Sequence, residues 1–171
     1  MAATETMVRM GELAVSRVPG HVLVSLGLGS CIGLALIDRK MGIAGLAHIV
    51  LPQSQGHDTE NPRKFADIAV PEMLSELERL GARRIRLEAV LVGGASMFAV
   101  SAAGLEVGQR NEAAVRELLV KERIPVVAAA TGGSRGRTVR VDVAGSSVKV
   151  REAGGKDEEL LTSSAMMAVA A

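Results

Sequence analysis

The sequence predicts an α+β domain of about eight short, mostly antiparallel strands in one or two sheets, with two long helices packed on one side. Short apolar runs bounded by glycine, proline or charged turns recur along the chain, whereas only two stretches show helical spacing of apolar residues. Strands and helices therefore do not alternate strictly. Of the 171 residues, 48% are hydrophobic but only 1% aromatic, so the core must be built from Val, Leu, Ile, Ala and Met.

Strands are expected wherever apolar residues alternate or form short unbroken runs. Val22, Val24 and Leu26 alternate as in a half-buried strand, and two almost wholly apolar runs follow on either side of a charged turn. In chain order the expected strands are residues 8–18, 21–26, 31–37, 42–51, 85–92 and 126–130, then a closing hairpin of 138–143 and 147–151. Residues 1–171 are read as a single domain with a core of 8–151 and flexible tails of 1–6 and 152–171.

Two stretches have the period of a helix. The first covers residues 65–80 and stops at Gly81, with Pro71 expected to bend it or to start a second helix. The second is expected to begin at Asn111, whose side chain can cap a helix, and to end before Pro125. Residues 97–108 are expected to contain a turn and a short strand near 105–107.

Composition excludes several classes of function. A net charge of +1 gives no field for recruiting nucleic acid, and so few aromatic side chains give no platform for stacking bases. The uncharged runs 21–37 and 89–105 are short and interrupted by glycines, so direct membrane insertion is not expected. A single cysteine and an N-terminus lacking the apolar block of a signal peptide favour the cytoplasm.

The residues that carry chemistry lie between Ser25 and Pro52. Cys31, the only cysteine, follows a glycine-containing turn, and His48 lies on the next expected strand. Neighbouring strands can bring a thiol and an imidazole together, which can make an attacking thiolate paired with an imidazolium. Backbone amides near Gly29 and Ser30 could hold an oxyanion, and the Ser25 hydroxyl could hold the imidazole. The competing interpretation is a small buried thiol and an ordinary core histidine.

Two other sets of residues give weaker signals. His57 and Asp58 could join His48 around a metal ion, but they lack the usual ligand spacing and are better explained as a solvated loop. The glycine-rich segment 132–137, with Arg135 and Arg137, resembles a phosphate cradle only loosely and contains no P-loop pattern. No metal site is therefore expected.

Beyond these arguments, the chain resembles a known family. The segment Leu26-Gly27-Leu28-Gly29-Ser30-Cys31, with Gly45-Leu46-Ala47-His48 and Leu51-Pro52, is similar to the CheD family of chemoreceptor glutamine deamidases. The likeness covers roughly residues 8–151. Further landmarks are Asn61-Pro62, Phe65-Ala66-Asp67, Gly81-Ala82-Arg83-Arg84, Leu87-Glu88-Ala89, Gly93-Gly94-Ala95, Met97-Phe98, Gly108-Gln109-Arg110-Asn111, Gly132-Gly133 and Gly136-Arg137.

The resemblance implies an α/β sandwich that deamidates receptor glutamines to glutamate in bacterial chemotaxis, without a metal or organic cofactor. The family's cysteine and histidine map onto Cys31 and His48, and its third position, commonly Thr, is Ser25 here. The implied substrate is the cytoplasmic helical region of a chemoreceptor. Family members also bind the phosphatase CheC, for which Phe98 is the expected contact.

Three alternatives stay open at this stage. The protein could be a thiol esterase acting on receptor methylglutamate. It could be a non-catalytic or dual-role regulator that binds a CheC-type phosphatase. It could also be an inactive relative, for which Ser25 in place of Thr is the only sign.

Overall fold

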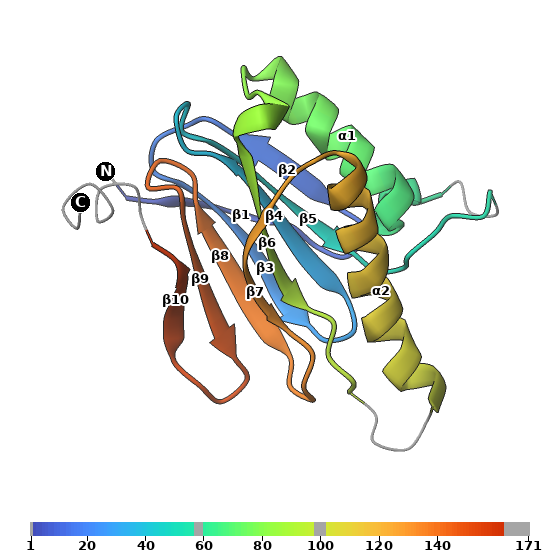
Figure 1. Cartoon of the computed structure of the whole chain (residues 1–171). Coiled ribbons are helices and arrows are strands. Elements are labelled where there is room, and N and C mark those ends of the chain that lie inside the picture. Colours follow the sequence, from blue (N-terminus) through green and yellow to red (C-terminus); the bar gives the residue numbers. More distant parts are fainter. Residues whose placement is uncertain (1, 57–59, 98–101, 163–171) are drawn as a thin grey trace.

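The computed structural model describes residues 2–56, 60–97 and 102–162. It has three layers: an outer sheet, a central sheet and a pair of helices (Figure 1). The outer sheet has the strand order β1-β3-β8-β9-β10, and the central sheet has the order β2-β5-β4-β6-β7. The α+β class is therefore confirmed, with ten strands in the described residues rather than about eight.

The outer sheet consists of β1 (Thr4–Met7), β3 (His21–Leu28), β8 (Arg137–Asp142), β9 (Ser147–Glu152) and β10 (Asp157–Leu161). The central sheet consists of β2 (Leu13–Ser16), β5 (Ile43–Ile49), β4 (Ile32–Asp38), β6 (Leu87–Gly93) and β7 (Val126–Thr131). The helices are α1 (Ala66–Arg79) and α2 (Ala102–Lys121). Between the described strands, β1–β3 and β6–β7 pair in parallel and the other pairs are antiparallel, as expected.

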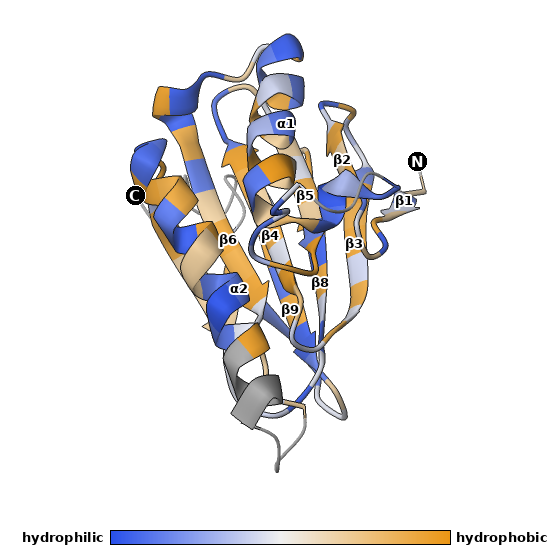
Figure 2. Ribbon diagram, turned by 90° about the vertical axis from the view of Figure 1, so that its right-hand side faces the viewer, coloured by the Kyte–Doolittle hydropathy of each residue, from blue (hydrophilic) through white to orange (hydrophobic). Residues whose placement is uncertain are grey.

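The central sheet is buried on both faces because its side chains alternate between two cores. On β4, Ile32, Leu34 and Leu36 pack toward the helices, while Ala35 and Ile37 pack toward the outer sheet. In Figure 2 both helices lie over the same face of the central sheet. The opposite face, buried between the two sheets, is the one that matters for the candidate site.

Helix α1 is continuous from Ala66 to Arg79, so Pro71 does not start a second helix. Pro71 lies in the early part of the helix on its exposed side, so only one backbone hydrogen bond is lost there. No helix in the described part of the chain is long and apolar enough to span a membrane.

Helix α2 differs from the expectation at its beginning. It already covers residues 105–107, which were expected to be a strand, and Asn111 lies in its interior rather than at its cap. The glycines in this stretch lowered the apparent helical signal. Gly108 is explained by packing, because a Cβ atom there would lie 2.7 Å from the Gly94 carbonyl oxygen.

Both chain ends form strands where the sequence predicted flexible tails. Thr4–Met7 pairs with β3, and Asp157–Leu161 pairs with β9. Neither segment is apolar enough to be recognised as a strand from its own residues. β10 pairs along β9 and packs Leu160 and Leu161 against the core, and one exposed ion pair joins Arg151 to Asp157 at 2.8 Å across the two strands.

Candidate active site

Cys31 lies in the segment that leads the chain from the outer sheet to the central sheet. Strand β3 ends at Leu28, and β4 begins at Ile32, directly after the cysteine. The register of β3 against β8 shifts between Ser25 and Leu28, which marks a bulge. Gly27 in this bulge has φ of +63°, a conformation that favours glycine. The glycine-rich sequence before the thiol is therefore needed for the change of sheet.

Three successive backbone carbonyls around the thiol are held by hydrogen bonds. The carbonyl oxygens of Gly29, Ser30 and Cys31 accept hydrogen bonds from Ala95 N at 2.8 Å, Asn111 Nδ2 at 2.9 Å and Gly94 N at 2.9 Å, respectively. The amide N–H groups of residues 29–31 donate to no carbonyl in the described part of the chain. A fixed loop whose amides donate to no carbonyl meets one requirement of an oxyanion hole, although the Cys31 amide interacts with its own thiol.

Cys31 and His48 lie on the same face of the central sheet. His48 is directly opposite Gly33 on the neighbouring strand, and Cys31 precedes Gly33 by two residues. Side chains two apart on a strand share a face, so the thiol and the imidazole are diagonal neighbours. The space over Gly33 is filled from the outer sheet, because a Cβ atom there would lie 2.8 Å from Leu28 Cδ1 and 3.3 Å from Val139 Cγ1.

One hydrogen bond fixes the tautomer of the His48 ring. Nδ1 lies 3.2 Å from the carbonyl oxygen of Val8, which can only accept, so Nδ1 carries the proton. In the neutral ring Nε2 is then an acceptor. It is buried and has no hydrogen-bond partner in the described part of the chain, the Cys31 thiol included. An imidazole held in this way offers a free basic nitrogen.

Ser25 reaches the imidazole through a third group. Its hydroxyl is fully buried and donates to the Val8 carbonyl oxygen at 2.8 Å, the same atom to which His48 donates. The sequence predicted that this hydroxyl would hold the imidazole itself. In the structure it donates to the carbonyl oxygen that also accepts from His48 Nδ1, so the two side chains are linked through that oxygen.

Burial favours the uncharged forms of both groups. Burial raises the pKa of the Cys31 thiol above its usual value, although its own backbone amide opposes the change. Burial also lowers the pKa of His48, against the hydrogen bond to Val8 and the charge of Glu12. Burial therefore disfavours the thiolate–imidazolium ion pair that the sequence analysis allowed.

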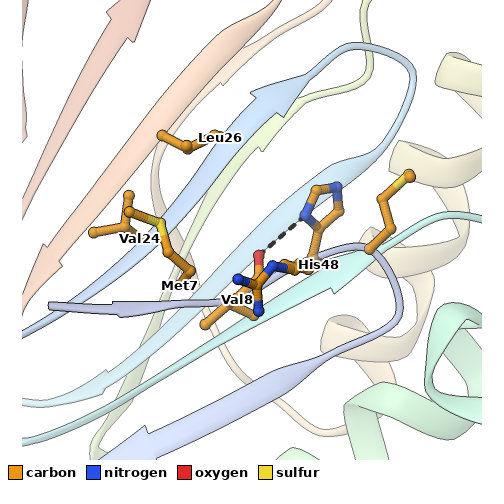
Figure 3. A pocket seen from close by; sticks show the side chains of 7 residues that line it. Met7, Val8, Val24, Leu26 and His48 are labelled. Atoms are coloured by element: carbon orange, nitrogen blue, oxygen red, sulfur yellow. Dashed lines mark hydrogen bonds between the residues drawn. The ribbon is translucent and has the colours of Figure 1, made fainter.

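A largely apolar cavity of about 370 Å³ opens beside His48 (Figure 3). It is lined by Met7, Val8, Arg9, Met10, Val24, Leu26 and His48. Met10 is 64% exposed and Leu26 is 53% exposed, so solvent reaches the rim. Cys31 is not among the lining residues, but at 9% exposed it is not completely enclosed.

The remaining candidate residues either lie outside the described part of the chain or are engaged in other contacts. His57, Asp58 and Phe98 lie outside the described residues. The guanidinium group of Arg137 is buried and donates to the Gly132 carbonyl at 2.8 Å, which explains it as a loop anchor rather than a phosphate ligand. Arg135 lies on the surface, 3.8 Å from Glu152. In the described part of the chain, His, Cys, Asp and Glu side chains form no group of three that could hold a metal ion.

Two groups at the site were not predicted from the sequence. The Val8 carbonyl is a backbone atom, so its role carries no side-chain signal. Asn111 is fully buried on α2 and donates to the carbonyls of Ser30 and Val50. A polar residue inside a helix indicates a specific role for its side chain, but the sequence also allowed Asn111 to begin a helix as its cap.

The fold and the site define an α+β protein of two packed sheets whose candidate reactive groups are a thiol and an imidazole on one buried sheet face. The model of the CheD family, described as CheD chemotactic sensory transduction, matches residues 50–152. The chain belongs to the CheD family.

Three relatives carry the name "Probable chemoreceptor glutamine deamidase CheD". The protein from Clostridium kluyveri is 43% identical and covers 90% of this chain and 96% of its own. The protein from Moorella thermoacetica is 46% identical and covers 88% of this chain and 92% of its own. The protein from Methanococcus vannielii is 41% identical and covers 85% of this chain and 93% of its own. Among solved structures, a Neisseria meningitidis protein matches with a TM-score of 0.48 at 10% identity over 77% of this chain and 63% of its own, too weak a likeness to carry any argument.

Proposed function

We propose that this protein is a cysteine-dependent deamidase that converts glutamine side chains in the cytoplasmic helical region of chemoreceptors to glutamate and releases ammonia. One observation carries the proposal. The lone cysteine shares a sheet face with a histidine whose tautomer leaves Nε2 free as a base, in a member of the CheD family. The names of its relatives give the substrate class.

The first half of the reaction forms a thioester. Nε2 of His48 takes the proton of the Cys31 thiol as the sulfur attacks the carboxamide carbon of the glutamine. The negative charge that develops on the carboxamide oxygen is stabilised by the backbone amides of Gly29 and Ser30. The imidazolium then gives its proton to the leaving nitrogen, the carbon–nitrogen bond breaks, and ammonia departs.

The second half returns the enzyme to its starting state. Nε2 takes a proton from a water molecule as its oxygen attacks the thioester carbon. The carbon–sulfur bond breaks, His48 returns the proton to the sulfur, and the product is a glutamate side chain. Both halves need a neutral imidazole at the outset, which is the form that burial favours. No metal or organic cofactor takes part in these steps.

We propose that the substrate approaches from the side of the apolar cavity, because this cavity reaches His48. A glutamine on a receptor helix is flanked by the residues one turn before and after it. The exposed apolar side chains of Met10 and Leu26 at the rim match small or apolar flanking residues better than charged ones. Since Nε2 has no partner at rest, the entry of the carboxamide is the event that completes the hydrogen bonding of the site.

The experiment is mass spectrometry of a receptor cytoplasmic fragment after incubation with the purified protein. Each converted glutamine gains about one dalton and releases one ammonia. Conversion that disappears in Cys31→Ala supports the proposal. Conversion at the parent rate in Cys31→Ala, or no conversion by the parent, contradicts it.

The same mixture separates the rival functions. Methanol release from a methylated receptor fragment, without ammonia release from the glutamine form, would identify a thiol esterase. A regulator of a CheC-type phosphatase would bind its partner equally well with or without the thiol and would convert nothing. If Ser25→Thr alone gains an activity that the parent lacks, the protein is an inactive relative.

A further inference from the structure

We propose that Asn111 is a positioning residue for the reaction, because its side-chain amide ties the segment that carries Cys31 to the end of the strand that carries His48. This inference rests on the proposed function, since it assigns a further role within the same site. Asn111 touches neither reacting group in a hydrogen bond. It acts through the backbone on either side of them.

The amide of Asn111 bridges two segments that are otherwise separate. Its Nδ2 lies 2.9 Å from the carbonyl oxygen of Ser30, one residue before the thiol. The same nitrogen lies 2.9 Å from the carbonyl oxygen of Val50, which directly follows the last residue of β5. The two protons of one amide group therefore set the spacing between the thiol segment and the histidine strand.

The chemistry of the bridge fixes which atom makes it. Two carbonyl oxygens can only accept, so the atom between them must be the nitrogen. The other atom of the amide, Oδ1, is buried and has no hydrogen-bond partner in the described part of the chain. A buried acceptor without a donor is unfavourable. A residue that served packing alone would be better replaced by an apolar side chain, so the two donated bonds are the reason for Asn at this position.

The helix is placed for this contact. Gly108, one turn before Asn111, permits α2 to approach the Gly94–Ala95 segment, because a Cβ atom there would lie 2.7 Å from Gly94 O and 2.8 Å from Ala95 O. The amide nitrogens of Gly94 and Ala95 hold the carbonyls of Cys31 and Gly29 in turn. Helix α2 and the end of β6 therefore hold the thiol segment from two sides.

The first test is deamidation by Asn111→Leu, which replaces the amide by an apolar side chain with the same branching of heavy atoms and removes both donated bonds. We expect kcat to fall about 10- to 100-fold with KM within about twofold, because misalignment affects the reacting atoms rather than substrate binding. Val115→Ala, one turn along the same helix at a fully buried site, is the matched control for lost stability. An Asn111→Leu enzyme whose kcat equals that of Val115→Ala overturns the proposal.

A second measurement does not depend on the substrate. Cys31 is the only cysteine, so its alkylation by iodoacetamide reports on the thiol alone. We expect Asn111→Leu and His48→Ala each to slow alkylation, and the double variant to be no slower than His48→Ala, since Asn111 acts by aligning the pair.

The two measurements separate the two claims. If the double variant is alkylated no more slowly than His48→Ala but no deamidation is found, the role of Asn111 stands and only the proposed substrate is overturned. Independent effects of the two substitutions, or alkylation that does not change in Asn111→Leu, would overturn the role of Asn111. For variants that fail to fold, as judged by circular dichroism, Asn111→Ser is measured in place of Asn111→Leu under the same criteria.

Discussion

Ser25 and His48 meet on one oxygen atom. The Ser25 hydroxyl and the His48 Nδ1–H both donate to the carbonyl of Val8, at 2.8 and 3.2 Å. The amide of Val8 donates in turn to Val24 O at 2.7 Å, which fixes the backbone at Val8. The orientation of the imidazole therefore depends on the connection between β1 and β2, two short strands that belong to different sheets.

Replacing Ser25 tests this indirect role. In Ser25→Ala the Val8 carbonyl keeps the bond from His48 and loses the other, so we expect a free energy of unfolding lower by about 1 kcal/mol. Because Nδ1 keeps its partner, kcat should fall by less than in His48→Ala. Ser25→Thr keeps the hydroxyl and serves as the control. Steady-state deamidation kinetics decide the point, and a loss in Ser25→Ala as large as in His48→Ala would show that the hydroxyl acts on the imidazole directly.

The stability of the protein should depend on pH through His48. Burial lowers the pKa of His48 in the folded protein below the value of about 6.5 expected in the unfolded chain. Between those two values the unfolded state binds more protons, so stability falls as the pH falls below about 6.5, by at most about 1.4 kcal/mol per pH unit. Urea unfolding from pH 7.5 to 5 measures this change.

His48→Asn isolates the contribution of this one group. Asn keeps a donor for the Val8 carbonyl but does not titrate, so the difference in stability between parent and variant should shrink as the pH is lowered through this range. Parallel curves for the two proteins would mean that the buried imidazole does not lose its proton on folding.

Gly93 tests how closely the end of β6 approaches the thiol segment. Its φ is +114°, and an added Cβ atom would lie 2.1 Å from the carbonyl oxygen of Cys31. Gly93→Ala must therefore displace the backbone at the thiol, and we expect kcat to fall by at least about tenfold. The measurement is kcat together with the unfolding free energy.

The control for Gly93 is a glycine with similar strain and no neighbour. Gly154 has φ of +79° in the turn between β9 and β10, and a Cβ atom there meets nothing within 4 Å. Gly154→Ala should cost about 1–2 kcal/mol of stability from backbone strain and leave kcat unchanged. Equal kcat values for the two variants would refute the account of Gly93.

The rim of the cavity should affect substrate binding alone. Met10→Glu places a charge where the apolar residues beside the target glutamine are proposed to pack, so KM should rise several-fold with little change in kcat. Ile85→Glu is the control, because Ile85 is also apolar and exposed, at 89%, and does not line this cavity. Equal effects of the two charges on KM would place the substrate elsewhere.

The sequence was informative where local pattern decides structure. Apolar alternation and glycine turns located β3, β4 and β5, and the helical period located α1 through Pro71. The lone thiol and the imidazole on the next strand were also recognisable as a possible pair, because adjacent antiparallel strands share their faces.

What the sequence could not show depends on distant contacts. β1 and β10 are strands only because β3 and β9 offer edges for pairing, and their own residues carry little preference for extended structure. The pKa directions of Cys31 and His48 follow from burial between two sheets. The convergence of Ser25 and His48 on Val8 involves a backbone atom about which side-chain identity says nothing.

The central claim is that the Cys31 sulfur becomes acylated by the substrate glutamine. Acid-quenched mixtures of the protein with a short receptor peptide, analysed by intact-protein mass spectrometry and peptide mapping, measure this directly. The account predicts a covalent adduct on Cys31 with the mass of the peptide minus ammonia, which disappears on longer incubation as glutamate is formed. Glutamate formation without any such adduct, or with an adduct that persists in Cys31→Ala, would contradict it.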